Sequence, residues 1–369
     1  MGLGPTILER SSRISIGGLK ILEGGACVVS ASPQGEAPLG TRVTAPLALS
    51  KINLTLLAHL AGDREVLCTA SEAGEAAGTI LQSHAGPHGL VQIQPGTAIL
   101  ALYPHDKRPQ VLGTFIRSLA GAKTVIHGLA SSPSAITVVI SSRKKNRAVQ
   151  QLFEHFNFPA FASPQEFFDA QPPPEEILQK VVATYQEKVI KVYLIVPQTD
   201  LDLWGMSIAS RDILEGFAFA LADLGELGLT IPFLVALPGL GTREFLVSFS
   251  TARTPAAGDQ GAEVRRILRT HLPDNRPVRL TPVAGISLHG PHFGDRYGIA
   301  HALVEALEKA QVTLLALSCT VSSISLIIRQ QELAPALLVL GNTFEAPVAG
   351  PTVAKKQDAG APEVLKCHV

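Results

Sequence analysis

The sequence lacks the features that would place it in several large classes of proteins. No run of about eighteen apolar residues occurs, so no transmembrane helix is expected, and residues 1–18 have no apolar core of a secretory signal. Positive charge is not in excess, because 31 Lys and Arg residues balance 31 Asp and Glu residues. This balance predicts neither nucleic acid nor a membrane surface as a partner. We therefore expect a cytoplasmic protein.

Cysteine is scarce, and the residues form no closely spaced pair: Cys27, Cys68, Cys319 and Cys367. Isolated cysteines favour reduced thiols, while the sequence alone leaves disulfide bonds open. Histidines lie four apart at residues 84 and 88 and three apart at residues 289 and 292. A metal site needs convergent side chains, usually with cysteine or carboxylate support, and these spacings do not specify convergence. We predict no metal and no cofactor.

Sequence motifs of nucleotide-dependent enzymes are also absent. Neither GxxxxGK[ST] nor GxGxxG occurs between an expected strand and an expected helix. Serines 131, 132, 322 and 323 lie in expected turns, with no base at a fixed spacing that would activate them. The sequence thus predicts no catalytic residue and a protein that is not an enzyme.

The chain does contain enough apolar material for a folded protein of two or more domains: it has 369 residues, of which 46% are hydrophobic and 17% charged. Residues 286–340 form its clearest unit. Ile299, Leu303, Leu307 and Ala310 recur at a spacing that places them on one apolar helix face. A strand and a Gly/Pro-rich loop precede this helix, and two strands and a short helix follow it. This order is most of a split βαβ unit, the ferredoxin-like arrangement.

An earlier copy of this unit indicates an internal repeat. Leu307 matches Leu119 near the end of a helix (307 − 119 = 188), and residues 324–328 match residues 136–140 at the same spacing. A weaker match relates residues 193–198 to residues 29–34, at a spacing of 164 (197 − 33 = 164). The drift in spacing predicts insertions in the later copy, at residues 200–210 and 251–261. Trp204, in the first of them, is expected either on a contact surface or packed over the sheet.

The repeats predict an α+β protein of four ferredoxin-like βαββαβ modules arranged in two pairs. The expected modules span residues 1–91, 92–163, 177–279 and 280–346. Residues 164–176, which include three consecutive prolines, are expected to form a semi-rigid linker between the pairs. Residues 347–369 are rich in Ala, Gly, Pro and Lys and are expected to be a disordered tail.

Two stretches resemble ACT domains of the regulatory region of aspartate kinases: ALEKAQVTLLALS followed by SSISLII, and ASSPSAITVVISSRKKNRAVQQLFEHF. The resemblance implies four tandem ACT-type modules, and no kinase domain, because nothing resembles the Lys-Phe-Gly-Gly-Thr-Ser type motif. In the family, a Gly-Ile-Asn segment opens the strand that follows the first helix. The corresponding segments here are Lys51-Ile52-Asn53, Lys123-Thr124-Val125, Gly228-Leu229-Thr230 and Gln311-Val312-Thr313.

The resemblance also implies effector sites in the loops that precede these helices, where free N–H groups attract a carboxylate. In the fourth module Asp295 would pair an α-amino group, Arg296 a carboxylate, and aromatic residues would wall the pocket. Asp295 can equally be an acidic residue that favours a helix start. The loop residues concerned are Phe293, Gly294, Asp295, Arg296, Tyr297 and Gly298.

Two further modules offer candidate effector contacts. Asp106 and Arg108 occupy the corresponding loop of the second module, and Asn53 occupies the family's asparagine position in the first. A solvated turn and ordinary turn chemistry, respectively, are the structural alternatives.

Taken together, the sequence predicts a non-catalytic regulatory protein that binds an amino acid at module interfaces. Its expected partners are this effector, an amino-acid biosynthetic enzyme controlled in trans, and a second copy of the chain in a homodimer. The alternative is a structural or assembly protein that kept the fold and lost effector binding, because the Gly-Ile-Asn positions are altered in modules two to four. An enzyme with an unrecognised site on the sheet faces is the third alternative.

Overall fold

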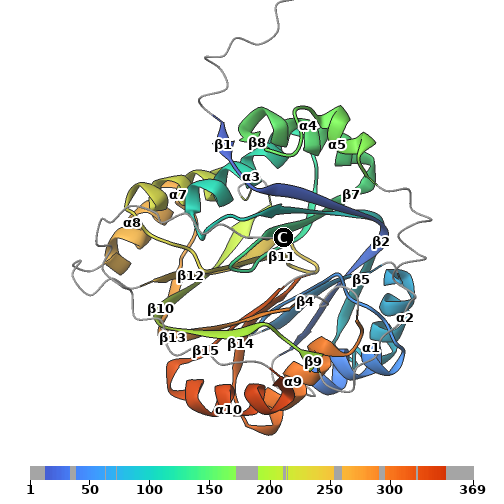
Figure 1. The fold of residues 1–369 in the computed structure, drawn as a ribbon. Helices are drawn as coiled ribbons and strands as arrows, with labels where there is room; N and C mark the ends of the chain where they lie inside the picture. Colours follow the sequence, from blue (N-terminus) through green and yellow to red (C-terminus); the bar gives the residue numbers. More distant parts are fainter. Residues whose placement is uncertain are drawn as a thin grey trace, which may run out of the picture.

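The computed structural model describes residues 13–33, 39–62, 64–71, 73–171, 190–210, 213, 215–252, 260–290, 296–320 and 323–345. Within these residues, twelve strands join into one closed barrel, which is flattened between two layers of helices (Figure 1). The strands follow one another around the barrel in the order β10-β12-β11-β6-β7-β5-β2-β4-β3-β14-β15-β13. Neighbouring strands are antiparallel, and the predicted mixture of helices and strands in an α+β fold is confirmed.

The same order of elements occurs twice along the chain. The first half contains β1 (Ile14–Ser15), β2 (Gly18–Pro33), α1 (Ala45–Leu49), β3 (Leu56–Leu60), β4 (Arg64–Ser71), α2 (Gly74–His84), β5 (Leu90–Tyr103), α3 (Pro109–Gly121), β6 (Ile126–Ser131), β7 (Ile136–Ser141), α4 (Lys145–His155) and β8 (Phe156–Asn157). The second half contains β9 (Ile190–Lys191), β10 (Leu194–Ala209), α7 (Gly216–Glu226), β11 (Phe233–Pro238), β12 (Glu244–Ala252), α8 (Gln260–His271), β13 (Val278–His289), α9 (Ile299–Lys309), β14 (Leu314–Cys319), β15 (Ser323–Arg329), α10 (Leu333–Thr343) and β16 (Phe344–Glu345).

The long strands β2 and β5 pass from one helix layer to the other. Leu19 and Ile21, near the start of β2, pack with α3 and α4, whereas Val28, further along the strand, packs with α2. The register of β2 against β5 shifts between these two parts, around Gly25. In the second half, β10 and β13 repeat this behaviour, with register shifts around Leu201. Each pair of long strands therefore belongs to both layers.

Each helix layer is built from both halves of the chain. The first layer contains α3 and α4 beside α7 and α8, and the second contains α1 and α2 beside α9 and α10 (Figure 1). Strand pairing follows the same rule, because β6 pairs with β11 and β3 pairs with β14. A third hydrophobic cluster, which includes Val29, Val235 and Ala316, lies among the barrel strands. The two halves are interleaved and do not lie end to end.

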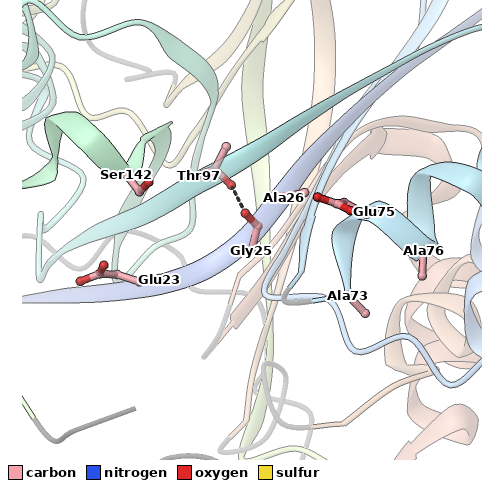
Figure 2. A pocket seen from close by; sticks show the side chains of 9 residues that line it. Glu23, Gly25, Ala26, Ala73, Glu75, Ala76, Thr97 and Ser142 are labelled. Atoms are coloured by element: carbon pink, nitrogen blue, oxygen red, sulfur yellow. Dashed lines mark hydrogen bonds between the residues drawn. The ribbon is translucent and has the colours of Figure 1, made fainter.

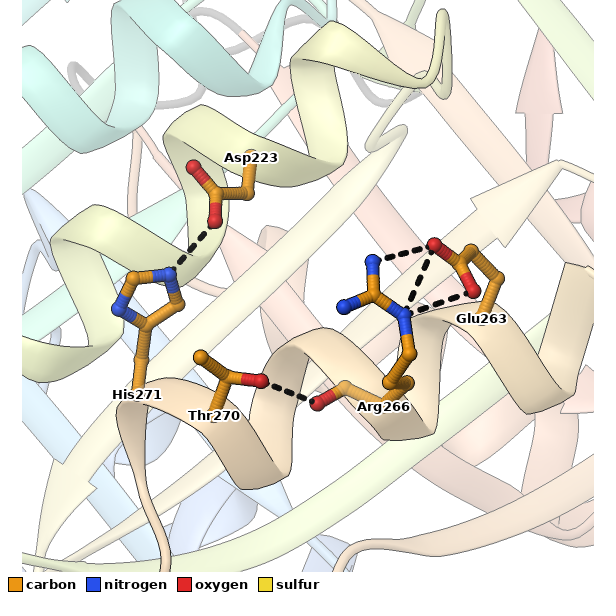
Figure 3. Close-up of polar contacts among 5 residues, drawn as sticks. All are labelled: Asp223, Glu263, Arg266, Thr270 and His271. Atoms are coloured by element: carbon orange, nitrogen blue, oxygen red, sulfur yellow. Dashed lines mark hydrogen bonds and ion pairs between the residues drawn. The ribbon is translucent and has the colours of Figure 1, made fainter.

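Polar contacts join the helices α7 and α8 at the surface of the first layer (Figure 3). His271 Nε2 lies 2.7 Å from Asp223 Oδ2, and the His271 ring stacks on Phe219 at 6.2 Å. On α8, Arg266 donates to both carboxylate oxygens of Glu263. These contacts are exposed and contribute little stability compared with the apolar cluster beneath them.

The helices α1, α3, α7 and α9 end in the same way. The second residue after each helix end has a positive φ: 56° at Lys51, 49° at Lys123, 70° at Gly228 and 57° at Gln311. The next residue donates its N–H to the carbonyl five positions earlier, as Val312 does to Leu307 at 2.9 Å and Thr124 to Leu119 at 3.5 Å. This pair of features is the Schellman motif. It confirms the predicted correspondence of Leu119 with Leu307.

Several sequence expectations differ from the fold. Residues 200–210 are not an insertion: residues 201–209 lie in β10 and pair with β12. Trp204 is fully buried, and its Nε1 donates to Thr251 Oγ1 at 3.2 Å, so packing is the correct alternative. The equivalent strands β2 and β10 both have 16 residues and begin 176 residues apart (194 − 18 = 176), so the spacing of 164 predicted for residues 29–34 and 193–198 is wrong.

Two of the expected module boundaries do not coincide with the ends of helices or strands. The positions 91/92 and 279/280 fall inside β5 and β13. The expected linker begins with a helix, α5 (Pro164–Asp169), whose Phe167 is fully buried. Residues 172–176 and 346–369 lie outside the described residues. Among the helices described, none is long and apolar enough to cross a membrane.

Candidate functional site

Helices from the two halves meet along two seams, one in each layer. In the second layer, a π-helical turn (Gly40–Thr44) and α1 run antiparallel to α9: the Gly40 N–H donates to Glu308 Oε1 at 2.8 Å, and Thr44 Oγ1 lies 3.2 Å from His301 Nδ1. At the other end, a β-carbon built on Gly298 would lie 3.9 Å from the β-carbon of Ala48. Each end of this seam joins a helix start from one half to a helix end from the other.

The first-layer seam pairs α3 with α7 in the same antiparallel sense. A β-carbon at Gly113 would lie 2.6 Å from the carbonyl oxygen of Ala218, so only glycine allows this approach. Arg117 of α3 lies over the ring of Phe219 of α7, at 5.8 Å. The two seams therefore have four ends, and each end brings residues from both halves of the chain together.

The predicted site before α9 is described in part. Phe293, Gly294 and Asp295 lie outside the described residues. Arg296 and Tyr297 are partly buried, and Gly298 is left-handed, with φ 83°, at the N-cap of α9. Gly298 starts the helix because its carbonyl accepts from Ala302 N–H at 2.9 Å. The described part of this loop thus lies at the end of the second-layer seam where α9 starts.

Asn53 belongs to the same end of the second-layer seam. It is partly buried in the turn between α1 and β3, five residues after Ala48, which lies beside Gly298. The turn is fixed by Thr55, whose N–H and hydroxyl both donate to the carbonyl of Ala70. Asn53 therefore lies near the same seam end as the described residues 296–298.

Asp106 and Arg108 face solvent in the loop before α3. Their side chains lie 3.5 Å apart and are 60% and 45% exposed. An exposed pair of this kind satisfies itself and offers little binding energy to a ligand. The loop residue that reaches the other half is a different one, Lys107.

Lys107 connects the loop to the second half of the chain. Its carbonyl accepts from Ile231 N–H at 2.8 Å, and its ammonium donates to Gln198 Oε1 at 3.4 Å. Burial lowers the pKa of Lys107. Burial, and then the charge of Lys107, lowers the pKa of His289. These contacts tie the loop before α3 to β10 and β13.

His105 is fully buried beneath the same loop. Its Nδ1 accepts from the N–H of Lys107 at 3.0 Å, so its Nε2 carries the proton and donates to the Ser132 carbonyl at 2.5 Å. Burial lowers the pKa of His105 more than these bonds raise it. The residue is therefore a neutral structural anchor for the loop.

A cavity of ≈ 820 Å³ opens at the remaining end of the first-layer seam. Lys123, Thr124 and Val125 line it from the first half, and Ser210 and Ile213 from the second. In the sequence, the first three residues stand out only as a departure from Gly-Ile-Asn. Their signal was the cationic residue at the position where the family has glycine.

A smaller cavity of ≈ 400 Å³ lies where β2 and β5 cross between the layers (Figure 2). It is lined by Glu23, Gly25, Ala26, Ala73, Glu75, Ala76, Gly96, Thr97 and Ser142. The Thr97 hydroxyl donates to the Gly25 carbonyl at 3.2 Å, and Glu23 pairs with Lys145. These four groups are already hydrogen-bonded or paired with one another. We therefore attribute the cavity to the passage of β2 and β5 from one helix layer to the other.

The turn serines have structural roles. The Ser132 hydroxyl lies 3.4 Å from the Ala135 carbonyl, and Ser134 Oγ lies 3.3 Å from Ser323 Oγ, which joins the hairpin β6–β7 to the hairpin β14–β15. Ser322 lies outside the described residues.

Burial raises the pKa of Cys319 to about 12. The described residues contain no group of three or more His, Cys, Asp or Glu side chains that could hold a metal ion.

The sequence matches no protein-family model and no curated protein. Among solved structures, an aspartate kinase from Synechocystis matches 89% of this chain and 55% of its own, with a TM-score of 0.71 and 15% identity. A regulatory subunit of aspartate kinase from Thermus thermophilus matches 38% of this chain and 99% of its own, with a TM-score of 0.34 and 15% identity. At this identity the first match shows a shared fold, and this chain spans about half the length of that kinase.

The first match corrects one prediction. The chain was expected not to be an enzyme and to lack a kinase domain, because the Lys-Phe-Gly-Gly-Thr-Ser type motif, GxxxxGK[ST] and GxGxxG are missing from the expected contexts. The solved structure whose fold matches 89% of this chain is, by its name, a kinase. One fold carries different catalytic sites, and short sequence motifs do not reveal all of them. The absence of these motifs was therefore not sufficient to exclude an enzyme.

Proposed function

We propose that this chain binds an amino acid at its helix seams and that binding regulates an aspartate-kinase-type activity, in the same polypeptide or in a partner. The observation that carries the proposal is the antiparallel meeting of α1 with α9, which brings Asn53 and the start of α9 to one seam end. The structural likeness to an aspartate kinase supports the choice of activity.

The repeated helix ends support a reading of the fold as four ACT-type modules. The left-handed residue of each Schellman turn is the first residue of the segment that corresponds to Gly-Ile-Asn in the family. The four turns occupy equivalent places, two in each seam. In this reading, modules one and four pair in the second layer, and modules two and three pair in the first.

A seam is a suitable place for regulation because it joins two parts that can repack. An effector changes an equilibrium only by its difference in affinity for the two arrangements. A molecule held between residues 53 and 296–298 would contact both halves and would favour the arrangement in which they lie close together. The N–H groups at the start of α9 would receive its carboxylate, beside Arg296.

A thermal-shift screen against the twenty amino acids tests this proposal, with calorimetric titration of any that act. A ligand at about 100 times its Kd stabilises the folded state by about 2.7 kcal/mol. The variants Asn53→Ala and Arg296→Gln should weaken binding about tenfold or more, which is about 1.4 kcal/mol. Arg269→Gln, at an exposed position of α8 away from this seam, is the matched control.

If no amino acid at millimolar concentration shifts the melting temperature, the sensing proposal fails and the assembly alternative is favoured. Equal loss of affinity in Arg269→Gln would show that the effect does not arise at the second-layer seam. A homodimer and a cytoplasmic location remain predictions, and sedimentation of the full chain measures the first.

A further inference from the structure

The cavity of ≈ 820 Å³ lies at one rim of the barrel, where five strands begin or end. Ile126 opens β6, Ser141 closes β7, Pro238 closes β11, and Phe245 lies at the start of β12. Ser210 follows the end of β10. The cavity extends inwards to Val29, which belongs to the cluster among the barrel strands. Barrel mouths are common places for small-molecule sites, and this volume is typical of them.

The lining of this cavity carries positive charge. Lys123, Arg143 and Lys144 line it and are exposed, and no carboxylate is among its described lining residues. None of the three takes part in an ion pair within the described residues. The chain as a whole has no net charge, so this local excess is a property of the site. Three cations around one cavity favour an anion of charge −2 or more.

A buried hydroxyl provides a second, independent observation. Thr124 lines the cavity and is 5% exposed, and its buried Oγ1 has no hydrogen-bond partner among the described residues. A buried hydroxyl without a partner is costly, and such a group commonly awaits a ligand or a water. Its neighbours Lys123 and Val125 also line the cavity, so this hydroxyl belongs to the cavity wall, one residue from a cation.

Much of the remaining lining is apolar. Val125, Ile126, Ile213, Pro238 and Phe245 contribute to it, and Gln92 and Gln94 add amide groups from β5. A simple inorganic ion would leave this surface unused. The combination fits a molecule with both an anionic group and a flat or apolar body.

We propose that the barrel mouth binds an organic phosphate of about the size of a nucleoside monophosphate. The phosphate lies among Lys123, Arg143 and Lys144, the Thr124 hydroxyl donates to the ligand, and the body packs against Phe245 and Pro238. The proposal concerns a different cavity and a different ligand class from the amino-acid site at Asn53, and it does not depend on that site.

Calorimetric titration with AMP and with ribose 5-phosphate tests the proposal on the full chain. We expect saturable binding that weakens as salt is raised, because exposed cations are screened. Adenosine, which lacks the phosphate, should bind at least tenfold more weakly than AMP. The variant Lys123→Gln/Arg143→Gln/Lys144→Gln should bind AMP at least tenfold more weakly. It should still fold, since all three side chains are exposed.

Two controls make the result specific. Lys20→Gln changes a lysine that lines a separate cavity of ≈ 320 Å³, and it should leave AMP affinity unchanged. Thr124→Val removes the unpartnered hydroxyl while keeping its shape, so it should weaken AMP binding about threefold to tenfold without lowering the melting temperature.

Three results would overturn the proposal. The first is absence of binding by both AMP and ribose 5-phosphate at millimolar concentration. The second is equal affinity for adenosine and AMP, which would mean that the cations do not contact the ligand. The third is tighter binding of citrate than of AMP, which would assign the site to carboxylates instead of phosphates.

Discussion

The backbone N–H of Gly40, in the first half of the chain, donates a hydrogen bond of 2.8 Å to the carboxylate of Glu308, in the second half. A β-carbon on Gly40 would collide with this carboxylate, so the contact depends on glycine at one end and glutamate at the other. The bond joins the start of the π-helical turn to the end of α9. It is the most direct polar link across the second-layer seam.

We predict that Glu308→Ala lowers the free energy of unfolding by about 1–3 kcal/mol, because the Gly40 N–H loses its acceptor. Urea denaturation, followed by the emission of the single Trp204, measures the change. Glu305→Ala is the matched control on the same helix. Glu305 pairs with the exposed Lys309, so its removal should change stability by less than about 0.5 kcal/mol. Equal effects of the two changes would show that the link to Gly40 contributes nothing.

Gly113→Ala should destabilise the first-layer seam by about 1–3 kcal/mol, because its β-carbon would lie 2.6 Å from the Ala218 carbonyl. A rigid backbone atom cannot move aside as a flexible side chain can. Gly205→Ala provides the comparison, since no atom lies within 4 Å of the β-carbon that it adds. Chemical denaturation of both variants gives the difference. A Gly113→Ala protein as stable as the parent would mean that α3 and α7 can separate at no cost.

The left-handed residues after the helices predict opposite effects at two equivalent positions. Gln311→Gly should stabilise the protein by up to about 1 kcal/mol, because glycine adopts a positive φ without the clash of a β-carbon. Gly228→Ala should destabilise it by about 1 kcal/mol for the same reason. Differential scanning calorimetry measures both. Destabilisation by Gln311→Gly would indicate that the glutamine side chain has a role beyond the turn.

Stability should fall as the pH is lowered from about 6.5 to about 4. Burial, assisted by the charge of Arg42, lowers the pKa of His59 to about 4. As the pH falls below 6.5, His59 takes up a proton in the unfolded chain before it does so in the folded protein. Its contribution to the free energy of unfolding is therefore complete above pH 6.5 and is lost as the pH approaches 4. A shift of this size corresponds to about 3 kcal/mol.

The variant His59→Leu isolates this contribution. Both ring nitrogens of His59 are buried without a hydrogen-bond partner among the described residues, so leucine should be accepted there and should flatten the stability profile between pH 6.5 and 4. The exposed His84→Leu is the comparison and should leave the slope unchanged. An unaltered slope in His59→Leu would assign the acid sensitivity to other groups, such as His105 or His289, whose pKa values are also lowered by burial.

The sequence predicted the fold best where apolar side chains repeat on helices and hairpins. Leu119 and Leu307 accept equivalent hydrogen bonds at two helix ends, and the turns closed by Ser132 with Ala135 and by Thr320 with Ser323 also lie 188 residues apart. Prediction failed in β10, where the drift in repeat spacing suggested an insertion at residues 200–210. Asp202 is buried, and its carboxylate accepts from Arg279 on β13 at 2.7 Å. Sequence spacing does not reveal a carboxylate whose partner lies on a distant strand.

The sequence identified a loop of a candidate site correctly, but it did not identify which residues of that loop contact the other half of the chain. The loop before α3 was found, yet Asp106 and Arg108 pair with each other while Lys107 reaches the second half. Asp106 and Lys107 both have positive φ, of 52° and 58°, which reverses the direction of the side chains. No periodic rule describes such a turn. The barrel mouth was missed because its lining comes from strands that are far apart in sequence.

The interleaving of the two halves has a consequence for how the polypeptide assembles. Each hydrophobic cluster draws on both halves, so neither half can cover its own apolar surface. Separate fragments containing residues 13–171 and 190–345 would have to recognise each other before either became ordered, as two different subunits do. Two intact chains that exchanged their second halves would bury the same contacts, and the result would be a domain-swapped dimer.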